Sequence, residues 1–560
     1  MTELLTAAQM RAIEQAAIAS GEVTGLDLIE RAGKAVVEAI LAKWPLYRDA
    51  PQSVVVLCGP GNNGGDGFVV ARLLKDLDWD VRVLFLGDSA RLPPDARINH
   101  DLWLAFGDTE PLTEKNLRRL PAMLYVDAIF GTGLSRPLDG DAWAVISHMA
   151  GRNGDDFSHC TISIDAPSGL CLDSGRVLGP AGGAFRPDPR PFAKLTVTFD
   201  SPKRGHFLAD GPQLCGELVV SDIGLAHWRE GADSDFSPAL VTLVTRHPVV
   251  PDRRRFLNRD FWFGSLNKSG HDSHKFTHGH ALILSGPAGQ TGAARLAARG
   301  ALRIGAGLVT IGCPPDALAE HAAQLTAIML KPNAIPADLT HILTDRRINA
   351  LCLGPGMGVS ASTRAMVAAA LAAPAPAPGP DGTKGPGAGP GLRCIVLDAD
   401  ALTSFADNPA ELFALTGDNT VLTPHGGEFA RLFPDLAERL AAPATKGLAY
   451  SKVDATRQAA ARAGCVVLFK GPDTVIAAPD GRCAVHAAPY DRAAPWLATA
   501  GSGDVLAGFI TGLMARGFPP VQAAETAVWL HVECARSFGP GLIAEDLPEA
   551  LPKVFRVLGG

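Results

Sequence analysis

Four short stretches in the first half of the chain carry polar side chains of the kinds that do chemistry. They are GPGNNGGDG (59–67), VDAIFGTGLSRPL (126–138), IDAPSG (164–169) and TFDSPKRG (198–205). In the second and third stretches, Asp127 and Asp165 lie in or just after an apolar run. A carboxylate in such a place is costly to bury unless it is paired, hydrogen-bonded or bound to a cation. Asn63, Asp127 and Ser168 supply oxygen ligands without any thiol or imidazole, so this set suits a hard cation better than zinc.

Each stretch follows an apolar run that we expect to be a β-strand, and helical segments separate the runs. The predicted strands are 54–57, 81–86, 124–130, 161–164 and 195–199. Strands that alternate with helices pair in parallel, because each crossover must be long enough to hold a helix. We therefore predict a doubly wound α/β sheet, whose ligands gather at the carboxyl ends of the strands. A lone aspartate at a strand end is commonly a helix cap. Four polar loops at strand ends in one domain nevertheless favour a ligand-binding site.

The first stretch also satisfies a G-x-G-x-x-G pattern through Gly59, Gly61 and Gly64. Between a strand and a helix this pattern is typical of NAD-dependent dehydrogenases, and Asp88 could then bind the ribose. However, Asp66 would repel the pyrophosphate that such a loop must approach. No His, Tyr or Lys constellation for hydride transfer follows either. A dehydrogenase is therefore the weakest of the candidate functions.

In the second half, the strongest pattern is TAGSGDVLAGFITGLMARG (499–517). Gly501 and Gly503 lead into a predicted helix, whose free N–H groups and dipole can bind an anion. Asp504 lies in the first turn, where its carboxylate can accept a proton from a substrate hydroxyl beside a transferring phosphate. An aspartate can also simply stabilise a helix N-terminus, but the flanking glycines favour the functional interpretation.

Other parts of the second half predict the domain that surrounds this turn. The predicted strands are 279–286, 308–311, 350–353, 394–397, 420–423 and 466–469, which again indicate an α/β fold. His425 follows one of these strands and precedes two glycines, so we expect it near a ligand. Lys470 ends another and could pair with a nucleotide phosphate. The sequence contains no P-loop motif.

The organisation of the chain follows from these patterns. We expect a first domain over 1–225, a linker over 226–240 and a second domain over 241–560. Residues 373–391 are almost wholly Ala, Pro and Gly. Such a segment has few side chains to bury, so we predict a disordered surface insertion in the second domain.

The composition excludes several classes of protein. Of the 560 residues, 47% are apolar and 19% charged, as in a packed globular protein. A net charge of −7 argues against a nucleic-acid partner, because such a partner needs a basic face. The ten cysteines form no C-x-x-C pair, so neither a disulfide framework nor a zinc site is indicated. The sequence has no apolar run of about 18 residues, so we expect no membrane span and a cytoplasmic location.

The four stretches of the first half, in their order, resemble the NAD(P)H-hydrate epimerase family over residues 1–225. The resemblance implies a Rossmann-like domain that interconverts the R and S forms of hydrated NADH or NADPH. The residues that would hold this substrate are Asn62, Asn63, Gly64, Gly65, Asp66, Gly131, Thr132, Gly133, Leu134, Ser135, Arg136, Pro137 and Asp165. Asp165 would lie at the reacting ring as a candidate catalytic acid or base, which Lys203 could assist. A potassium ion would be bound by Asn63, Asp127 and Ser168.

The second half is similar to the ribokinase-like fold and, within it, to ADP- or ATP-dependent NAD(P)H-hydrate dehydratases. The residues that would meet the hydrated dinucleotide are Ala293, Gly356, His425 and Asp504, with Asp504 as the catalytic base. The residues that would bind ADP or AMP are Lys470, Gly471, Pro472, Asp473, Thr474 and Gly503. Magnesium would be expected to neutralise the transferring phosphoryl group.

Together these resemblances predict a bifunctional repair enzyme for hydrated NADH or NADPH. The first domain would exchange the two epimers, and the second would phosphorylate the S hydrate and eliminate phosphate to restore NAD(P)H. We expect small-molecule substrates and a homo-oligomer, and the sequence leaves ADP or ATP open as the donor. The alternatives are a ribokinase-like small-molecule kinase, or a first domain that binds a nucleotide as a sensor or scaffold without turnover.

Overall fold

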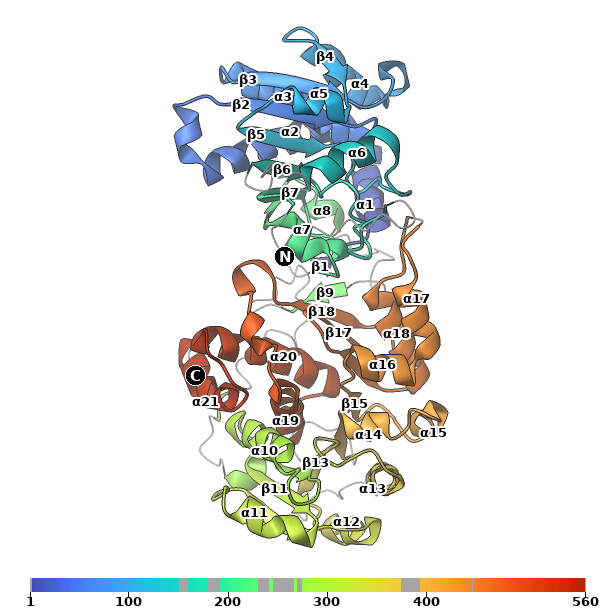
Figure 1. Ribbon diagram of the computed structural model, residues 1–560, viewed down its shortest axis with the longest axis vertical. Helices are drawn as coiled ribbons and strands as arrows, with labels where there is room; N and C mark the ends of the chain where they lie inside the picture. The colour runs from blue at the N-terminus through green and yellow to red at the C-terminus, as the bar shows by residue number, and fades with distance from the viewer. Residues whose placement is uncertain are drawn as a thin grey trace. The chain divides into compact units, whose positions relative to one another are not determined.

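The structure is a computed structural model that describes residues 3–150, 160–179, 192–229, 241–244, 266–268, 274–373, 393–445 and 447–558. The chain divides into two compact units (Figure 1). Apart from the first two residues, one unit consists of Glu3–Val241 with Ala442–Ser451, and the other of Thr242–Ala441 with Lys452–Gly560. Residues 230–240 of the predicted linker and 374–391 of the predicted insertion lie outside the described residues.

The first unit begins with a short strand and two helices and continues as alternating strands and helices. Its strands are β1 (Glu3–Leu4), β2 (Ser53–Cys58), β3 (Asp80–Phe85), β4 (Thr109–Pro111), β5 (Leu124–Ala128), β6 (Thr161–Ile164), β7 (Leu195–Phe199) and β8 (Glu217–Ser221). Its helices are α1 (Ala7–Ala19), α2 (Gly25–Lys43), α3 (Asn62–Asp76), α4 (Pro94–Trp103), α5 (Glu114–Arg118), α6 (Gly140–Met149), α7 (Gly211–Cys215) and α8 (Ala226–Arg229).

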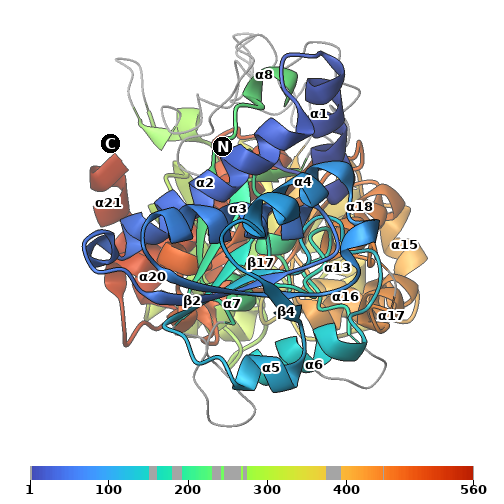
Figure 2. The same cartoon turned by 90° about the horizontal axis from the view of Figure 1, so that it is seen from above.

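A 7-stranded sheet in the order β4-β3-β2-β5-β6-β7-β8 forms the centre of this unit. All neighbouring strands in it are parallel. Helices α2, α3 and α4 lie on one face and α5 and α6 on the other (Figure 2), so strands β2 and β5 are buried almost throughout. The predicted doubly wound sheet is confirmed. The chain winds outward from β2 in one direction and from β5 in the other, which places the ligand crevice between these two strands.

Helix α8 uses the first residues of the segment that we predicted to be a linker. Its Arg229 lies with Nη1 3.2 Å from the buried Asp200 Oδ2, so this helix is tied to the first unit. The exact division of the chain within 226–240 stays a prediction.

The second unit is also an α/β unit. Its strands are β9 (Val241–Leu243), β10 (His280–Leu284), β11 (Leu308–Cys313), β12 (Met329–Pro332), β13 (Ile348–Leu353), β14 (Cys394–Leu397), β15 (Thr420–Leu422), β16 (Val466–Phe469), β17 (Asp473–Ala477) and β18 (Cys483–Ala487). Its helices are α10 (Gly292–Arg303), α11 (Leu318–Ala322), α12 (Pro336–Ile342), α13 (Ala361–Leu371), α14 (Asp400–Thr403), α15 (Pro409–Phe413), α16 (Gly426–Leu432), α17 (Pro434–Ala441), α18 (Lys452–Ala463), α19 (Ser502–Ala515), α20 (Pro520–Phe538) and α21 (Asp546–Leu558).

The sheet of this unit contains the strand order β18-β17-β16-β15-β14-β13-β10-β11-β12. Pairing is parallel from β16 to β12 and antiparallel from β16 to β18. Helix α19 packs closely against α10 (Figure 1). At their contact, a Cβ added to Gly508 would lie 2.1 Å from the Ala297 carbonyl oxygen, so only glycine lets the two backbones approach this closely. The predicted two-domain α/β fold class is confirmed.

Membrane insertion of a helix finds no support here. None of the helices within the described ranges combines the length and the apolar character that a bilayer span requires.

Candidate active sites

A cavity of about 460 Å³ opens in the first unit at the carboxyl ends of its central strands. It is lined by loops after β2, β5, β6 and β7 and by one face each of α1 and α2. Of the predicted substrate-binding residues, those that line it are Asn62, Asn63, Asp66, Gly131, Thr132, Gly133 and Asp165. A cavity of this size at a switch point is where an α/β sheet binds a ligand.

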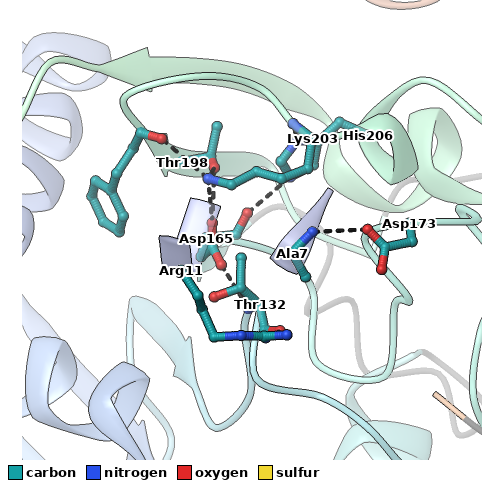
Figure 3. Close-up of polar contacts among 9 residues, drawn as sticks. Ala7, Arg11, Thr132, Asp165, Asp173, Thr198, Lys203 and His206 are labelled. Atoms are coloured by element: carbon teal, nitrogen blue, oxygen red, sulfur yellow. Dashed lines mark hydrogen bonds and ion pairs between the residues drawn. The ribbon is translucent and has the colours of Figure 1, made fainter. Parts of the chain in front are cut away.

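Asp165 is held by three donors from three parts of the chain (Figure 3). Its Oδ1 accepts from Thr198 Oγ1 at 2.8 Å and from Lys203 Nζ at 3.1 Å. Its Oδ2 accepts from the backbone N–H of Thr132 at 2.8 Å. Asp165 follows β6 with a φ of 64°, a left-handed conformation that non-glycine residues rarely adopt. The strained backbone and the three bonds together fix the carboxylate at the cavity.

Lys203 makes this carboxylate a charged group. The side chains of Lys203 and Asp165 are only 1% and 7% exposed, and Lys203 Nζ also donates to Thr198 Oγ1 and to the Phe199 carbonyl oxygen. Burial works to raise the pKa of Asp165, but the nearby charge of Lys203 and the hydrogen bonds from Thr198 and Lys203 together hold that pKa below its usual value. The cavity therefore contains an ionised aspartate.

His206 fixes the backbone on which Asp165 lies. Its Nδ1 accepts from the backbone N–H of Lys203 at 3.0 Å, so the proton must lie on Nε2, which donates to the Asp165 carbonyl oxygen at 2.9 Å. Burial and the charge of Lys203 lower the pKa of His206 to about 4, which keeps the ring neutral. A neutral imidazole thus links the two partners of the ion pair.

The three predicted potassium ligands lie around one loop. Ser168 donates from its N–H and Oγ to the two oxygens of Asp127 at 2.7 and 2.6 Å, and its Oγ accepts from Phe130 N at 2.9 Å. A Cβ at the next residue, Gly131, would lie 2.8 Å from Asn63 Oδ1 and 2.7 Å from an oxygen of Asp165. The structure thus brings Asn63 and Ser168 to either side of the same loop.

The glycines of the first stretch serve close packing. A Cβ on Gly64 would lie 2.0 Å from the Gly59 carbonyl oxygen, and one on Gly65 would lie 3.1 Å from Ala96 Cα. Asp66, in the next position, is only 9% exposed and faces the cavity. Burial and the negative charge of Asp165 raise its pKa well above the usual value.

Leu134, Ser135, Arg136 and Pro137, the second half of the other predicted binding loop, do not line the cavity. Leu134 packs against the small apolar cluster of Cys171, Leu178 and Ala449. The Ser135 carbonyl oxygen accepts from Gly447 N at 2.8 Å. Their role as substrate ligands stays a prediction.

In the second unit, Asp504 lies in a group of charged residues. It follows Gly501, whose φ of 85° lets the chain turn into α19. Burial and the charge of Asp398 raise the pKa of Asp504 to about 7. Asp398 itself accepts from Lys470 Nζ at 2.6 Å and from Thr423 Oγ1 at 2.8 Å. Lys470 is thus paired with Asp398 rather than with Asp504.

The other residues predicted to bind the hydrated dinucleotide surround this group. His425 has a side chain that is 55% exposed, and it caps α16 by accepting from Gly427 N at 2.9 Å. Glu428, three residues on, lies 3.9 Å from Lys470. A Cβ on Gly356 would lie 3.6 Å from Ala293 Cβ, so these two predicted contacts are neighbours.

The predicted nucleotide-binding residues also meet at Lys470. A Cβ on Gly503 would lie 3.6 Å from Lys470 Nζ, which links the turn before α19 to this strand end. Thr474 Oγ1 donates to the Gly471 carbonyl oxygen at 2.9 Å and forms a tight turn around Pro472. Asp473 is paired with Lys452 at 2.7 Å, so its carboxylate supports the fold of this turn.

Sequence reasoning missed several residues that complete the two sites. Thr198 and His206 were not singled out, although both belong to the fourth stretch or follow it directly. Asp398 and Glu428 lie in the conspicuous segments LDADAL (397–402) and TPHGGEFARL (423–432), which gave no specific role. Their positions could have indicated a role, because Asp398 directly follows the buried strand β14 and Glu428 lies in the first turn of α16.

No group of three or more His, Cys, Asp or Glu side chains that could hold a metal occurs among the residues with a described placement. The predicted potassium set is of another kind, because it consists of an amide, a hydroxyl and a single carboxylate.

Comparisons with known proteins cover the same two regions. A family model for NAD(P)H-hydrate dehydratase matches residues 281–553, and a model for the YjeF-related protein N-terminus matches residues 25–205. The NAD(P)H-hydrate epimerase of Rhodobacter capsulatus is 45% identical to this chain over 40% of this chain and all of its own length. The ADP/ATP-dependent NAD(P)H-hydrate dehydratase of Bacillus subtilis, co-crystallised with ATP and Mg²⁺, gives a TM-score of 0.40 at 26% identity over 53% of this chain and 95% of its own.

Two relatives match the chain from end to end. The bifunctional NAD(P)H-hydrate repair enzyme Nnr of Moorella thermoacetica is 33% identical over 99% of this chain and 97% of its own length. The enzyme of the same name from Coxiella burnetii is 31% identical over 98% of both chains. By this full-length similarity, the chain belongs to the family of bifunctional NAD(P)H-hydrate repair enzymes.

Proposed function

We propose that the cavity of the first unit epimerises hydrated NADH and NADPH, and that the charged group around Asp504 dehydrates the S hydrate with a nucleotide as phosphoryl donor. The observation that carries the proposal is geometric. Asp165 and Lys203 form a buried ion pair that lines the cavity of the first unit, and in the second unit Asp504 lies in the first turn of α19, next to Gly503 and Lys470. Family membership supports the assignment of the two activities to one chain.

In the epimerase cavity, Asp165 is the candidate acid or base at the reacting ring. Hydration of the enamine double bond puts the hydroxyl on the carbon next to the ring nitrogen, so that nitrogen can expel it as water once it is protonated. A fixed carboxylate stabilises the cation that results and accepts a proton from the water that returns. Lys203 keeps Asp165 charged and in place for both tasks.

The residues around Asp127 fit a potassium ion. Asn63 Oδ1 and Ser168 Oγ both lie at the loop of Phe130 and Gly131, and Asp127, which Ser168 contacts, is fully buried. Burial raises the pKa of Asp127 to about 6, and a bound cation would offset that cost. We propose Asn63, Asp127 and Ser168 as its ligands, since their oxygens suit a hard cation, and the ion would supply charge compensation near the substrate.

In the second unit, we propose that Asp504 accepts the proton of the substrate hydroxyl as this oxygen attacks a nucleotide phosphate. A base with a pKa of about 7 is well matched to neutral pH. Lys470 and the N-terminus of α19 bind the transferred phosphate, with Gly503 leaving room for it. Phosphate then leaves in place of hydroxide, and loss of a proton from the neighbouring ring carbon restores the double bond. Asp398 and Glu428, within 4 Å of Lys470, fit a magnesium ion that would neutralise phosphate charge.

The proposal includes a cytoplasmic location and a homo-oligomeric state. No disulfide joins any of the ten cysteines, all of which lie within the described ranges, and this supports a reducing compartment. Fractionation of cells and light scattering of the purified protein test these two points.

The deciding experiment incubates the purified protein with a mixture of R and S hydrates of NADH, first without nucleotide and then with ADP or with ATP. We expect exchange of the epimers in every case and recovery of reduced-nicotinamide absorbance only with a nucleotide. A stable phosphorylated product without that recovery would favour the small-molecule kinase. Tight binding without turnover of either epimer would favour a sensor or scaffold.

A further inference from the structure

Helix α1 contributes a carboxylate to the epimerase cavity, and none of the steps proposed for epimerisation uses it. Met10, Glu14 and Ile18 recur every four residues, so one face of α1 lines the cavity. Glu14 is the acidic residue on that face. Among the described residues it forms no hydrogen bond or ion pair, so the fold does not need it as a structural partner.

The position of α1 relative to Asp165 is fixed at two points (Figure 3). The first helical residue, Ala7, donates its N–H to Asp173 Oδ1 at 2.8 Å. One turn later, Arg11 Nη1 donates to the Thr132 carbonyl oxygen at 2.9 Å, and the N–H of the same Thr132 donates to Asp165. Glu14 lies one further turn along, so it is held at a defined place in the cavity that Asp165 shares.

Glu14 and Asp165 titrate in different ranges. Burial raises the pKa of Glu14 to about 7, and the negative charge of Asp165 acts in the same direction while Lys203 opposes it. Asp165 has a pKa below its usual value. At neutral pH Glu14 therefore carries a proton much of the time, whereas Asp165 does not. Two carboxylates with separated pKa values are the arrangement that acid–base catalysis requires.

The charged groups that line the cavity or act on Glu14 come from several elements. They are Arg11 on α1, Asp66 on α3, Asp95 before the second turn of α4, Asp165 after β6, and Asp200 and Lys203 after β7. Asp200 is paired with Arg229, and Asp95 lies beside Gly25. Asp66 is the rival for the role of acid, because it also faces the cavity.

We propose that Glu14 is a second catalytic residue of the epimerase, which exchanges a proton with the substrate hydroxyl while Asp165 exchanges one with water on the other face of the ring. The proposal rests on the proposed epimerase function and on the assignment of Asp165.

The reaction balances with water as its only co-reactant. Glu14 donates its proton to the hydroxyl oxygen, the C–O bond breaks with its electron pair, and water leaves. The lone pair of the ring nitrogen forms the C=N bond of an iminium ion. Water then adds to the opposite face, the C=N pair returns to nitrogen, and Asp165 accepts the proton. In the reverse reaction Asp165 donates the proton and Glu14 accepts it. The active form of the enzyme is therefore the one in which Glu14 and Asp165 together carry a single proton.

The test uses the full chain without nucleotide, so that dehydration does not consume the S hydrate. Starting from pure R hydrate, we expect Glu14→Gln to lower the kcat for epimerisation about 10²- to 10⁴-fold while the KM changes little, because glutamine cannot release a proton. In the wild-type protein, kcat should fall as pH rises through about 7, where Glu14 loses its proton. This fall should be absent from the residual activity of Glu14→Gln. Glu14→Asp should retain part of the rate.

Three comparisons make the outcome decisive. Unchanged dehydration of S hydrate by Glu14→Gln with nucleotide, together with an unchanged KM for R hydrate in epimerisation, shows that both units of the variant are folded. If Glu14→Gln retains the wild-type kcat, or if Asp66→Asn rather than Glu14→Gln removes the fall above pH 7, the role of Glu14 is refuted. If Asp165→Asn leaves epimerisation intact while Glu14→Gln abolishes it, the Asp165 assignment fails and Glu14 stands as a proton-transfer residue. If wild-type protein exchanges no epimers, the epimerase function itself fails.

Discussion

The two units place an aspartate and a lysine at the carboxyl ends of parallel strands, but they arrange the pair differently. In the first unit, Lys203 Nζ lies 3.1 Å from Asp165, the proposed catalytic group itself. In the second unit, Lys470 Nζ lies 2.6 Å from Asp398 and only influences Asp504. As a result the pKa of Asp165 is lowered, whereas burial and Asp398 raise that of Asp504 to about 7.

This difference matches the two proposed tasks. An aspartate that must stabilise a cationic intermediate has to stay charged, and a buried lysine beside it ensures this. An aspartate that must take a proton from an alcohol is more effective when its conjugate acid has a pKa near the working pH. The lysine of the second unit is engaged by Asp398, and its lowering of the pKa of Asp504 is smaller than the rise that burial and Asp398 cause.

The largest expected effect comes from removing that base. Asp504→Asn should lower nucleotide-dependent dehydration of S hydrate by about 10²- to 10⁴-fold, because the amide cannot accept the proton. Recovery of reduced-nicotinamide absorbance measures it. Epimerisation by the same variant, assayed without nucleotide, should equal that of wild type. Equal losses of both activities would mean that the two sites are not separate.

Lys203→Met should destabilise the first unit by about 3–5 kcal/mol, since it leaves a buried carboxylate without its partner. The cost should grow with pH. With Lys203 present, the pKa of Asp165 is lower in the folded than in the unfolded protein, so its ionisation stabilises the fold at pH values above the unfolded pKa. Without Lys203, burial raises the folded pKa of Asp165, so its ionisation opposes folding as pH rises. Urea unfolding at pH 5 and pH 8 measures this. Lys34→Met is the control, because its pair with Glu38 is exposed and should contribute little.

Much of this arrangement could be predicted from the sequence. The apolar runs that predicted strands correspond to β2, β3, β5, β6 and β7 and to β10, β11, β13, β14, β15 and β16, because a buried parallel strand leaves a strong local pattern. Edge strands such as β4 and β12 are short and partly exposed, and they gave no such pattern. The antiparallel strands β17 and β18 were also missed; Gly471 and Pro472 interrupt the apolar pattern just before β17.

The candidate sites divide in the same way. Asp165 and Asp504 stand beside glycines and small polar residues in conspicuous loops, so their types and positions were informative. Glu14 lies in an ordinary amphipathic helix, and Asp398 ends one strand of many. Their importance comes from which charges the fold places nearby, and that depends on contacts between residues far apart in sequence.

A smaller effect should follow when the partner of Lys470 is neutralised. Asp398→Asn removes the negative charge that helps to raise the pKa of Asp504, so the base should stay ionised at lower pH. Dehydration, relative to its maximum in each protein, should therefore persist to about one pH unit below wild type, which corresponds to about 1.4 kcal/mol, while loss of a proposed magnesium ligand should lower the maximum itself. Thr423→Val keeps the charge of Asp398 and removes the hydroxyl that donates to Asp398 and to the Leu397 carbonyl oxygen, so it should shift the profile less. An unchanged pH profile in Asp398→Asn would mean that protonation of Asp504 does not cause the loss of dehydration at low pH.

The smallest effect separates positioning from stability in the first unit. Thr198 Oγ1 donates to Asp165 and accepts from Lys203, both at 2.8 Å, so it holds the pair in one geometry. Thr198→Val should cost about 1 kcal/mol, the usual contribution of one hydrogen bond, and should slow epimerisation several-fold.

Thr196 offers a matched control for this variant. It lies two residues earlier on β7, is equally buried, and donates instead to the Cys215 carbonyl oxygen at 2.7 Å. Thr196→Val should therefore lower the free energy of unfolding by a similar amount and leave epimerisation unchanged. If both variants slowed epimerisation alike, loss of stability would explain the effect of Thr198→Val. In that case the Thr198 hydroxyl would have no specific role in the pair of Lys203 and Asp165. The different pKa values of Asp165 and Asp504 would then follow from where Lys203 and Lys470 lie.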